Sequence, residues 1–338
     1  MAKPIGRSAS SAFFFSLPRP QAFAYGGQAV IEGVMMRGPR SFAVAVRRGD
    51  GSILVDRQLL PAWAARRGPG GWPLVRGVLA LVEALVLGIR VLSFSAGVAA
   101  EGEGEELGRG EMALALLLAV GLAVGLFVVL PALAGHWSAV RLGPWGQNLL
   151  EGGLRLAVFL GYLAAIARLQ EVRTLFAYHG AEHKVIHCWE AGAGLDPVAA
   201  QAFPRLHPRC GTSFVLLVML VAVLLYSLIP VSGLAVRMAV RVGLLPLVAG
   251  LSYEVLRWSA RLQDRWPVRM LIAPGLGLQK MTTREPDRDQ LEVAAAALEA
   301  VLADENSDGT KEVCDGRPSR PGCTEPGAAG ESGRASGS

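Results

Sequence analysis

Four of the chain's five histidines lie between positions 179 and 207, and three of them are regularly spaced. His179, His183 and His187 follow one another at intervals of four residues within the segment 178–190. Four residues advance an α-helix by slightly more than one turn, so a helix here carries three imidazoles in one stripe. Two histidines at this spacing can bind one first-row metal ion. The stripe therefore predicts a helical segment that binds metal.

The remaining ligands must come from elsewhere in the chain. His179 and His187 would be about 12 Å apart along a helix, which is too far for one ion to bind both. We expect two neighbouring histidines to bind, with His207 or Cys210 completing the site. Any site that uses neighbouring members of the stripe then includes His183. Imidazole ligands favour a divalent metal such as zinc, with iron or nickel as alternatives.

Three carboxylates are candidates for acid–base catalysis. Glu190 falls on the histidine stripe, Glu182 lies at its edge, and Glu32 lies in a glycine-rich segment far from both in sequence. A carboxylate beside a metal-bound water can act as general base in hydrolysis. The order His-Gly-Ala-Glu-His differs from the HExxH motif of zinc peptidases, so the motif does not imply a peptidase. In the alternative interpretation, the histidines are a structural or solvated stripe, and Glu32 forms a surface ion pair with Arg37.

Composition indicates a polytopic α-helical membrane protein. The chain has 338 residues, of which 52% are hydrophobic and only 18% are charged. This is too apolar for an ordinary soluble protein. The formal net charge of +5 makes anionic membrane lipid the expected partner, and DNA is not expected. The four cysteines do not form a disulfide framework, since cytosolic loops favour free thiols or metal ligands.

About four segments have the length and apolarity of transmembrane helices. The fourth contains Pro246, which should kink it or mark a broken or re-entrant segment. The second can continue into the histidine helix. The four segments are 112–133, 149–169, 213–229 and 240–256.

Other parts of the chain have distinct patterns. Residues 41–47 alternate between bulky and small or polar side chains, as in a β-strand. In the apolar helix 74–99, Arg76, Glu83 and Arg90 recur every seven residues and share one stripe, which favours an interfacial or re-entrant helix. The predicted parts are a disordered basic tail (1–22), a small cytosolic β unit (23–60), a linker and amphipathic membrane-associated helix (61–111), transmembrane helices with a cytosolic histidine-rich loop at 170–212 (112–258), a cytosolic segment with an amphipathic helix (259–303), and a disordered tail (304–338).

Lysine and arginine counts predict the orientation in the membrane. The loops 134–148 and 230–239 each contain one basic residue, Arg141 and Arg237, whereas the histidine loop and the segment after the fourth span contain several. Basic loops remain in the cytosol. We therefore expect both termini and the histidine loop on the cytosolic side.

Four motifs resemble one family. They are Gly27–Gly38 (GQAVIEGVMMRG), Tyr178–Glu190 (YHGAEHKVIHCWE), His207–Phe214 (HPRCGTSF) and a segment from Leu278 to Val293. Together they are similar to the YqhQ-like family of uncharacterised bacterial membrane proteins, whose members are often labelled metal-dependent enzymes. The resemblance covers residues 23–303 and implies a multi-pass protein of the bacterial inner membrane. It does not imply a reaction.

Two functions of different classes follow from these residues. The first is a membrane-embedded metal-dependent enzyme, such as a hydrolase, with a cytosol-facing His/Glu/Cys site. The second is a non-enzymatic scaffold or chaperone subunit that assists membrane-protein assembly or translocation. In that case the histidine cluster is structural, and the basic surface meets a membrane-protein partner or a ribosome or translocon component.

Overall fold

A computed structural model describes the backbone of residues 25–60, 71–103, 108–229, 231, 233–262 and 265–309. The basic tail predicted at 1–22, the linker residues 61–70 and the part of the C-terminal tail beyond 309 lie outside the described residues.

The N-terminal unit is an antiparallel sheet whose four strands pair in chain order. Its third strand is buried on both faces. Phe42, Val44 and Val46 point to one face, and the smaller Ala43 and Ala45 point to the other. The predicted β unit is confirmed as the strands β1 (Gly26–Val30), β2 (Gly33–Arg37), β3 (Ser41–Arg47) and β4 (Ile53–Leu59).

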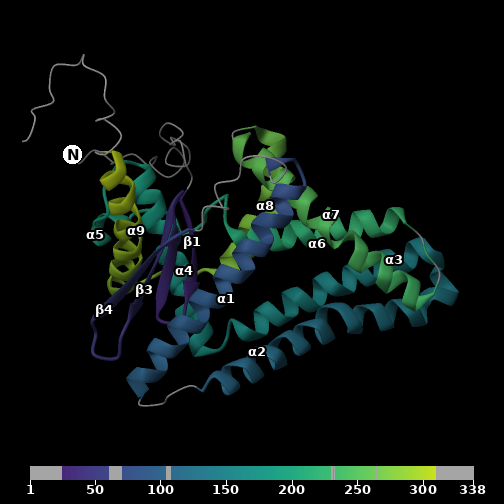
Figure 1. Cartoon of the computed structure of the whole chain (residues 1–338). Helices are drawn as coiled ribbons and strands as arrows, with labels where there is room; N and C mark the ends of the chain where they lie inside the picture. Colours follow the sequence, from purple (N-terminus) through teal and green to yellow (C-terminus); the bar gives the residue numbers. More distant parts are fainter. Residues whose placement is uncertain are drawn as a thin grey trace, which may run out of the picture.

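Helices cover both faces of this sheet (Figure 1). Helix α1 (Val75–Glu103) packs against the bulky face with Leu87, Val91 and Val98. The face with the two alanines is covered by α4 (Gln170–Glu190) and α9 (Arg288–Gly309). Alanine side chains let a helix approach the sheet closely. The histidine helix α4 therefore packs against both the sheet and α9.

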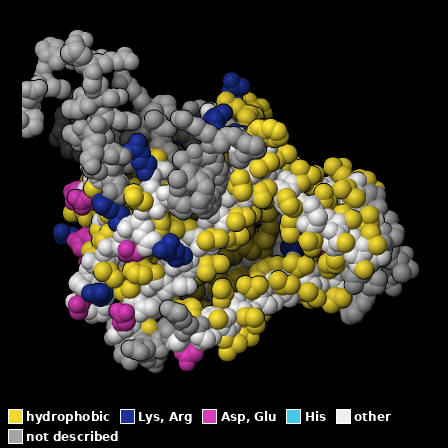
Figure 2. All heavy atoms as spheres, in the orientation of Figure 1, with side chains coloured by type: hydrophobic (Ala, Val, Ile, Leu, Met, Phe, Trp, Pro, Cys, Tyr) yellow, Lys and Arg dark blue, Asp and Glu magenta, His cyan; other side chains and the backbone are white. Residues whose placement is uncertain are grey.

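The described residues include five helices that are long and apolar enough to cross a membrane, which indicates a membrane protein. The helix expected to be interfacial, now α1, also meets this criterion, so the number is one more than predicted. Figure 2 shows hydrophobic side chains over the part of the molecule away from the sheet, where α2, α3, α6, α7 and α8 lie. The candidate spans are Val75–Glu101, Gly110–Gly135, Trp145–Ile166, Gly211–Leu228 and Ala235–Ser259.

Two boundaries between the helices differ from expectation. The predicted loop 134–148 is helical and belongs to α3 (Leu130–Ile166). Helix α3 follows directly on α2 (Arg109–Val124) and a π-helical turn η3 (Gly125–Val129), and the chain reverses only at Gly143, inside α3. Gly143 has a φ of 64°, which a glycine adopts without strain. A short turn ending at Leu169, whose backbone is extended, separates α3 from the histidine helix.

The C-terminal half contains the remaining helices. Helix α7 (Leu234–Arg261) continues through Pro246 and is not a broken segment. Helix α8 (Trp266–Thr282), which the sequence did not predict, follows it and packs against α6 (Gly211–Leu228). A short helix α5 (Pro197–Ala200) lies between α4 and α6.

Candidate metal centre

The histidine helix buries one face and turns another toward the loop before α6. Tyr178, Ala181 and Val185 belong to the core shared with the sheet and α9. The histidine stripe faces the segment 205–210, which brings His207 and Cys210 to it. Cys210 is the N-cap residue of α6, so the start of a membrane helix fixes its position. The predicted helix and its contact with the 207–211 turn are both present.

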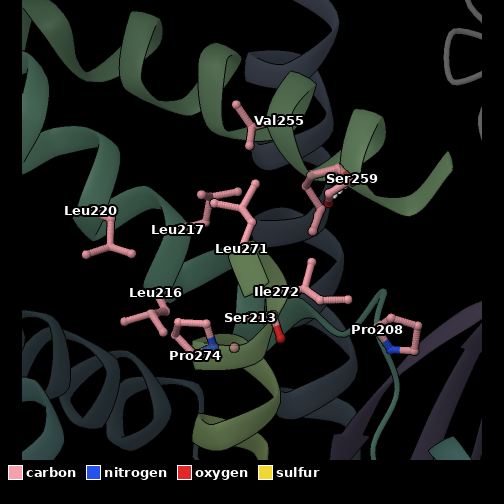
Figure 3. A pocket seen from close by; sticks show the side chains of 12 residues that line it. Pro208, Ser213, Leu216, Leu217, Leu220, Val255, Ser259, Leu271, Ile272 and Pro274 are labelled. Atoms are coloured by element: carbon pink, nitrogen blue, oxygen red, sulfur yellow. Dashed lines mark hydrogen bonds between the residues drawn. The ribbon is translucent and has the colours of Figure 1, made fainter. Parts of the chain in front are cut away.

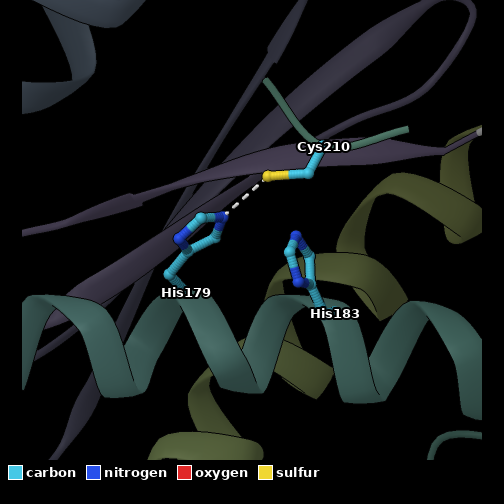
Figure 4. Close-up of side chains that lie close together, drawn as sticks. All are labelled: His179, His183 and Cys210. Carbon is cyan, nitrogen blue, oxygen red and sulfur yellow. Dashed lines mark hydrogen bonds between the residues drawn. The ribbon is translucent and has the colours of Figure 1, made fainter. Parts of the chain in front are cut away.

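Two groups of ligand atoms form along this contact. In the first, one ligand atom from each of His179, His183 and Cys210 lies within 4.8 Å of the others. His179 Nε2 is 3.2 Å from Cys210 Sγ, and both imidazoles point toward the thiol (Figure 4). His183 and Cys210 are buried. Two imidazoles and a thiol at this separation could supply three of the four ligands of a tetrahedral zinc site.

Main-chain carbonyls fix the tautomers of both histidines. His179 Nδ1 donates to the Thr282 carbonyl at 2.8 Å, and His183 Nδ1 donates to the Arg205 carbonyl at 2.6 Å. A carbonyl can only accept, so each Nδ1 has the proton and each Nε2 has a lone pair toward the thiol. Metal-binding histidines are usually held in this way. The described part of the chain thus presents the first group in a form that is ready to bind metal.

The second group consists of His187, Glu190 and His207. His187 Nε2 donates to the Leu206 carbonyl at 3.1 Å, and His207 Nε2 is 3.9 Å from Glu190 Oε2. This group contains only one histidine of the stripe and does not include His183, so the expectation about neighbouring stripe members does not apply to it. Arg209 also forms an ion pair with Glu190. Because a guanidinium already neutralises this carboxylate, the second group is less suited to a cation than the first.

The two groups are adjacent. Ring centroids are separated by 4.5 Å between His179 and His183, 5.6 Å between His183 and His207, and 4.6 Å between His207 and His187. The four imidazoles therefore form one continuous row.

Burial controls the protonation of this row. It lowers the pKa of His183 and of His207 to about 4, so both are neutral at pH 7. Burial opposes ionisation of Cys210, but the neighbouring His183 and Thr212 outweigh it and lower the pKa of the thiol. Burial also opposes ionisation of Glu190, but His207 and Arg209 bring its pKa to about 2. Neutral imidazoles and an acidic thiol are the states that bind metal.

The other two predicted carboxylates are outside both groups. Glu182 is buried against the sheet, where the Gly27 main-chain N–H donates to it, and burial raises its pKa to about 7. Glu32 accepts a hydrogen bond from the Tyr178 hydroxyl at 3.3 Å. Arg37 pairs with Glu83 of α1 at 2.7 Å, so the proposed surface pair between Glu32 and Arg37 is wrong.

Gln279 connects the site to the membrane helices, a role that the sequence did not predict. Its side chain accepts from the His207 N–H and donates to the His207 carbonyl and to Ser213 Oγ, each at 2.8 Å. Ser213 lines an apolar pocket between α6, α7 and α8 (Figure 3). Other lining residues include Pro208, Leu217, Val255 and Leu271. The pocket therefore begins at Pro208, the residue directly after His207.

In the metal-free protein, stability should fall as the pH falls from 7 to 5. The unfolded chain protonates its histidines below about pH 6.5, whereas folded His183 and His207 do so only near pH 4. In this window the two histidines make the unfolded state bind more protons, which costs on the order of 1–2 kcal/mol per histidine at pH 5. Glu182, whose folded-state pKa is raised to about 7, binds a proton in the folded state over the same window and offsets part of this loss. Melting of chelator-treated protein at both pH values measures this, and His183→Gln should reduce the difference. Equal melting temperatures for wild type at pH 7 and 5 would contradict it.

Comparisons with known proteins place these residues in a family context. Residues 72–304 match a family described as "Protein of unknown function (DUF1385)". Over 301 residues, the chain is 36% identical to the "Uncharacterized protein YqhQ" of Bacillus subtilis (strain 168), covering 82% of this chain and 92% of that protein. No solved structure matches.

Proposed function

The chain belongs to the uncharacterised YqhQ-like family, DUF1385, and from the geometry of its histidine row we propose that it is a membrane-embedded metal-dependent hydrolase. The observation that supports this most is the pair of imidazoles, His179 and His183, whose Nδ1 atoms are bound by carbonyls and whose Nε2 atoms face Cys210. A three-ligand site leaves one position of a tetrahedral zinc ion for water, whose pKa the ion lowers toward 7.

The surrounding residues have separate roles in this proposal. Glu182 lies on the same helix as the two histidines of the first group, and with a pKa raised by burial to about 7 it serves as the acid–base residue. Glu190 is held by Arg209 and keeps His207 in place. Glu32 orients Tyr178 and has no direct part in the reaction.

The apolar pocket supports a substrate that is partly embedded in the membrane. It lies at the N-terminal end of α6 and the C-terminal end of α7, next to Pro208 and Ser213. The apolar lining matches a lipid chain in polarity, and the bond to be cleaved would then lie near the loop that contains His207 and Cys210. Metal-dependent cleavage of a lipid or of a lipid-linked molecule is the reaction class that uses both the histidine row and the apolar pocket.

Chain connectivity supports four crossings rather than five. The sheet and α4 are in contact, so both lie on the same side of the membrane, and an even number of crossings must separate them. Three of the five candidate spans, in α1, α2 and α3, occur between them. One of the three therefore does not cross. Helix α1 packs along the sheet and its Glu83 pairs with Arg37 of β2, which favours α1 as the interfacial helix.

We expect the residues at 141 and 280 to lie on opposite sides of the membrane. With α2, α3, α6 and α7 as spans, Arg141 lies in the first outer turn and Lys280 in the cytosol with the histidine row. Reporter domains fused after Arg141 and after Lys280 measure this in a bacterial inner membrane. Reporters on the same side would contradict the topology.

Hydrolysis assays on membrane-presented lipid esters and phosphodiesters test the enzymatic part. Turnover that a chelator abolishes and added zinc restores supports it. The alternative is a scaffold or chaperone for membrane-protein assembly or translocation. A folded protein that lacks turnover on every class, and that co-purifies with translocon or ribosome components from native membranes, would favour this alternative.

A further inference from the structure

A second cluster of charged side chains lies inside the bundle formed by α3, α6 and α7. Glu151 and Arg155 come from α3, and Arg237 and Arg241 come from α7. Tyr226 of α6 is beside them, with the Arg241 guanidinium 5.5 Å from its ring centroid. Tyr226 is sixteen residues beyond Cys210 in the chain, or about 24 Å along the helix. The cluster is therefore separate from the histidine row.

Positive charge exceeds negative charge in this cluster. All three arginines surround one carboxylate: Arg241 pairs with Glu151, Arg155 Nη2 is 3.1 Å from Glu151 Oε1, and Arg237 Nη1 is 3.8 Å from Glu151 Oε2. No other acidic side chain among the described residues pairs with them. Three arginines and one glutamate leave a formal charge of +2.

The excess charge is buried. The exposed fractions of the side chains are 1% for Glu151, 5% for Arg237, 9% for Arg241 and 14% for Arg155. Arginine does not lose its proton in proteins. An uncompensated charge in such an environment costs several kcal/mol, so an anion is required to balance it.

Two of the arginines also donate to other groups, and two guanidinium donors of the cluster are unused. Arg155 Nε donates to the Phe127 carbonyl of the π-helical turn at 2.8 Å, and Arg241 Nη2 donates to Asn148 Oδ1 at 3.3 Å. The buried Arg237 Nη1 and Arg241 Nε have no hydrogen-bond partner within the described structure. The cluster thus presents oriented guanidinium groups with unused donors, as anion sites do.

We propose that this cluster binds a doubly charged phosphate group. A phosphate monoester has a charge of about −1.5 to −2 and three acceptor oxygens, which match the excess charge and the free donors. Glu151 is six residues inside the candidate span that begins at Trp145, about 9 Å along the helix. That depth is close to the headgroup layer. The phosphate can therefore belong to a lipid or be inorganic phosphate.

Binding measurements on the full chain test the proposal and separate the two sources. The protein is placed in phosphatidylcholine nanodiscs, and phosphatidic acid, phosphatidylglycerol or inorganic phosphate is added. Bound lipid is counted by native mass spectrometry, and phosphate binding is followed by the melting temperature. Preference for phosphatidic acid over phosphatidylglycerol identifies a lipid phosphate monoester, and stabilisation by inorganic phosphate identifies the free anion. If the protein shows neither a preference for phosphatidic acid nor stabilisation by inorganic phosphate, the proposal is wrong.

Substitutions within α7 locate the site. Arg237→Gln should weaken phosphate or phosphatidic acid binding at least about tenfold, because it removes the guanidinium with the fewest protein partners. Arg261→Gln removes the same charge from the exposed far end of the helix and should bind as wild type does. Glu151→Gln should bind more tightly than wild type, since it removes the competing carboxylate. Equal binding by the Arg237 and Arg261 variants would overturn the assignment.

Discussion

Replacing His183 should remove the metal ion from the first ligand group. His183 supplies one of three ligands and is buried, so no solvent-exposed residue can take its place. Loss of a residue that only orients a ligand weakens metal binding by about 10–100-fold, so loss of a ligand should cost about 100-fold or more. His183→Gln is a better variant than alanine, because it fills the buried site with a polar side chain of similar length and leaves no cavity. Elemental analysis of protein purified without chelators measures the loss.

Two further variants identify the group that holds the ion. His187→Gln alters only the second group and should keep the metal of the first. His136→Ala changes the chain's fifth histidine, which lies outside the 179–207 segment, and should behave as wild type. A His183→Gln protein with full metal content would contradict the prediction, and so would folded wild type without metal. Retention by the His183 variant with loss by the His187 variant would move the site to the second group.

The sequence predicted the histidine helix because the signal is local. A spacing of four residues determines which side chains share a helix face, whatever the rest of the chain does. Because histidine and cysteine are common metal ligands, His207 and Cys210 could be expected to lie near the histidine helix. The division into two groups could not, because it depends on the path of the 205–210 loop. The carbonyls of Arg205 and Thr282 were also unpredictable, since every residue has a carbonyl and its direction depends on tertiary structure.

Helix α8 and the charged cluster show where sequence patterns have too little information. Pro274 and two nearby glycines, Gly275 and Gly277, lower the helical signal of α8, which packing against α6 overrides. In the sequence, Arg237 counts only as the basic residue of the loop 230–239, and Arg155 carries no separate prediction. Their convergence on Glu151 requires α3 and α7 to come together, which no local pattern encodes.

Gly180→Ala should destabilise the protein strongly, although alanine is the better helix former. A Cβ at position 180 would be 2.0 Å from the main-chain oxygen of Arg284, far inside van der Waals contact. That segment cannot easily move, because the Arg284 N–H donates to the Phe176 carbonyl at 2.8 Å. Overpacking of this kind costs about 1–3 kcal/mol, and each lost hydrogen bond adds about 1 kcal/mol. We expect a melting temperature lower by about 3–6 °C.

The same substitution should also weaken metal binding, which connects the packing of α4 to the site. Moving Arg284 away from α4 also moves Thr282, whose carbonyl fixes the tautomer of His179. Gly277→Ala in α8 is the matched control, because a Cβ there meets nothing within 4 Å and alanine should stabilise the helix by about 0.5–1 kcal/mol. Melting curves and metal titrations of both variants separate a clash from a general effect of alanine. A Gly180→Ala protein that melts and binds metal as wild type does would mean that the 282–286 segment yields freely, and that it does not hold His179 in place.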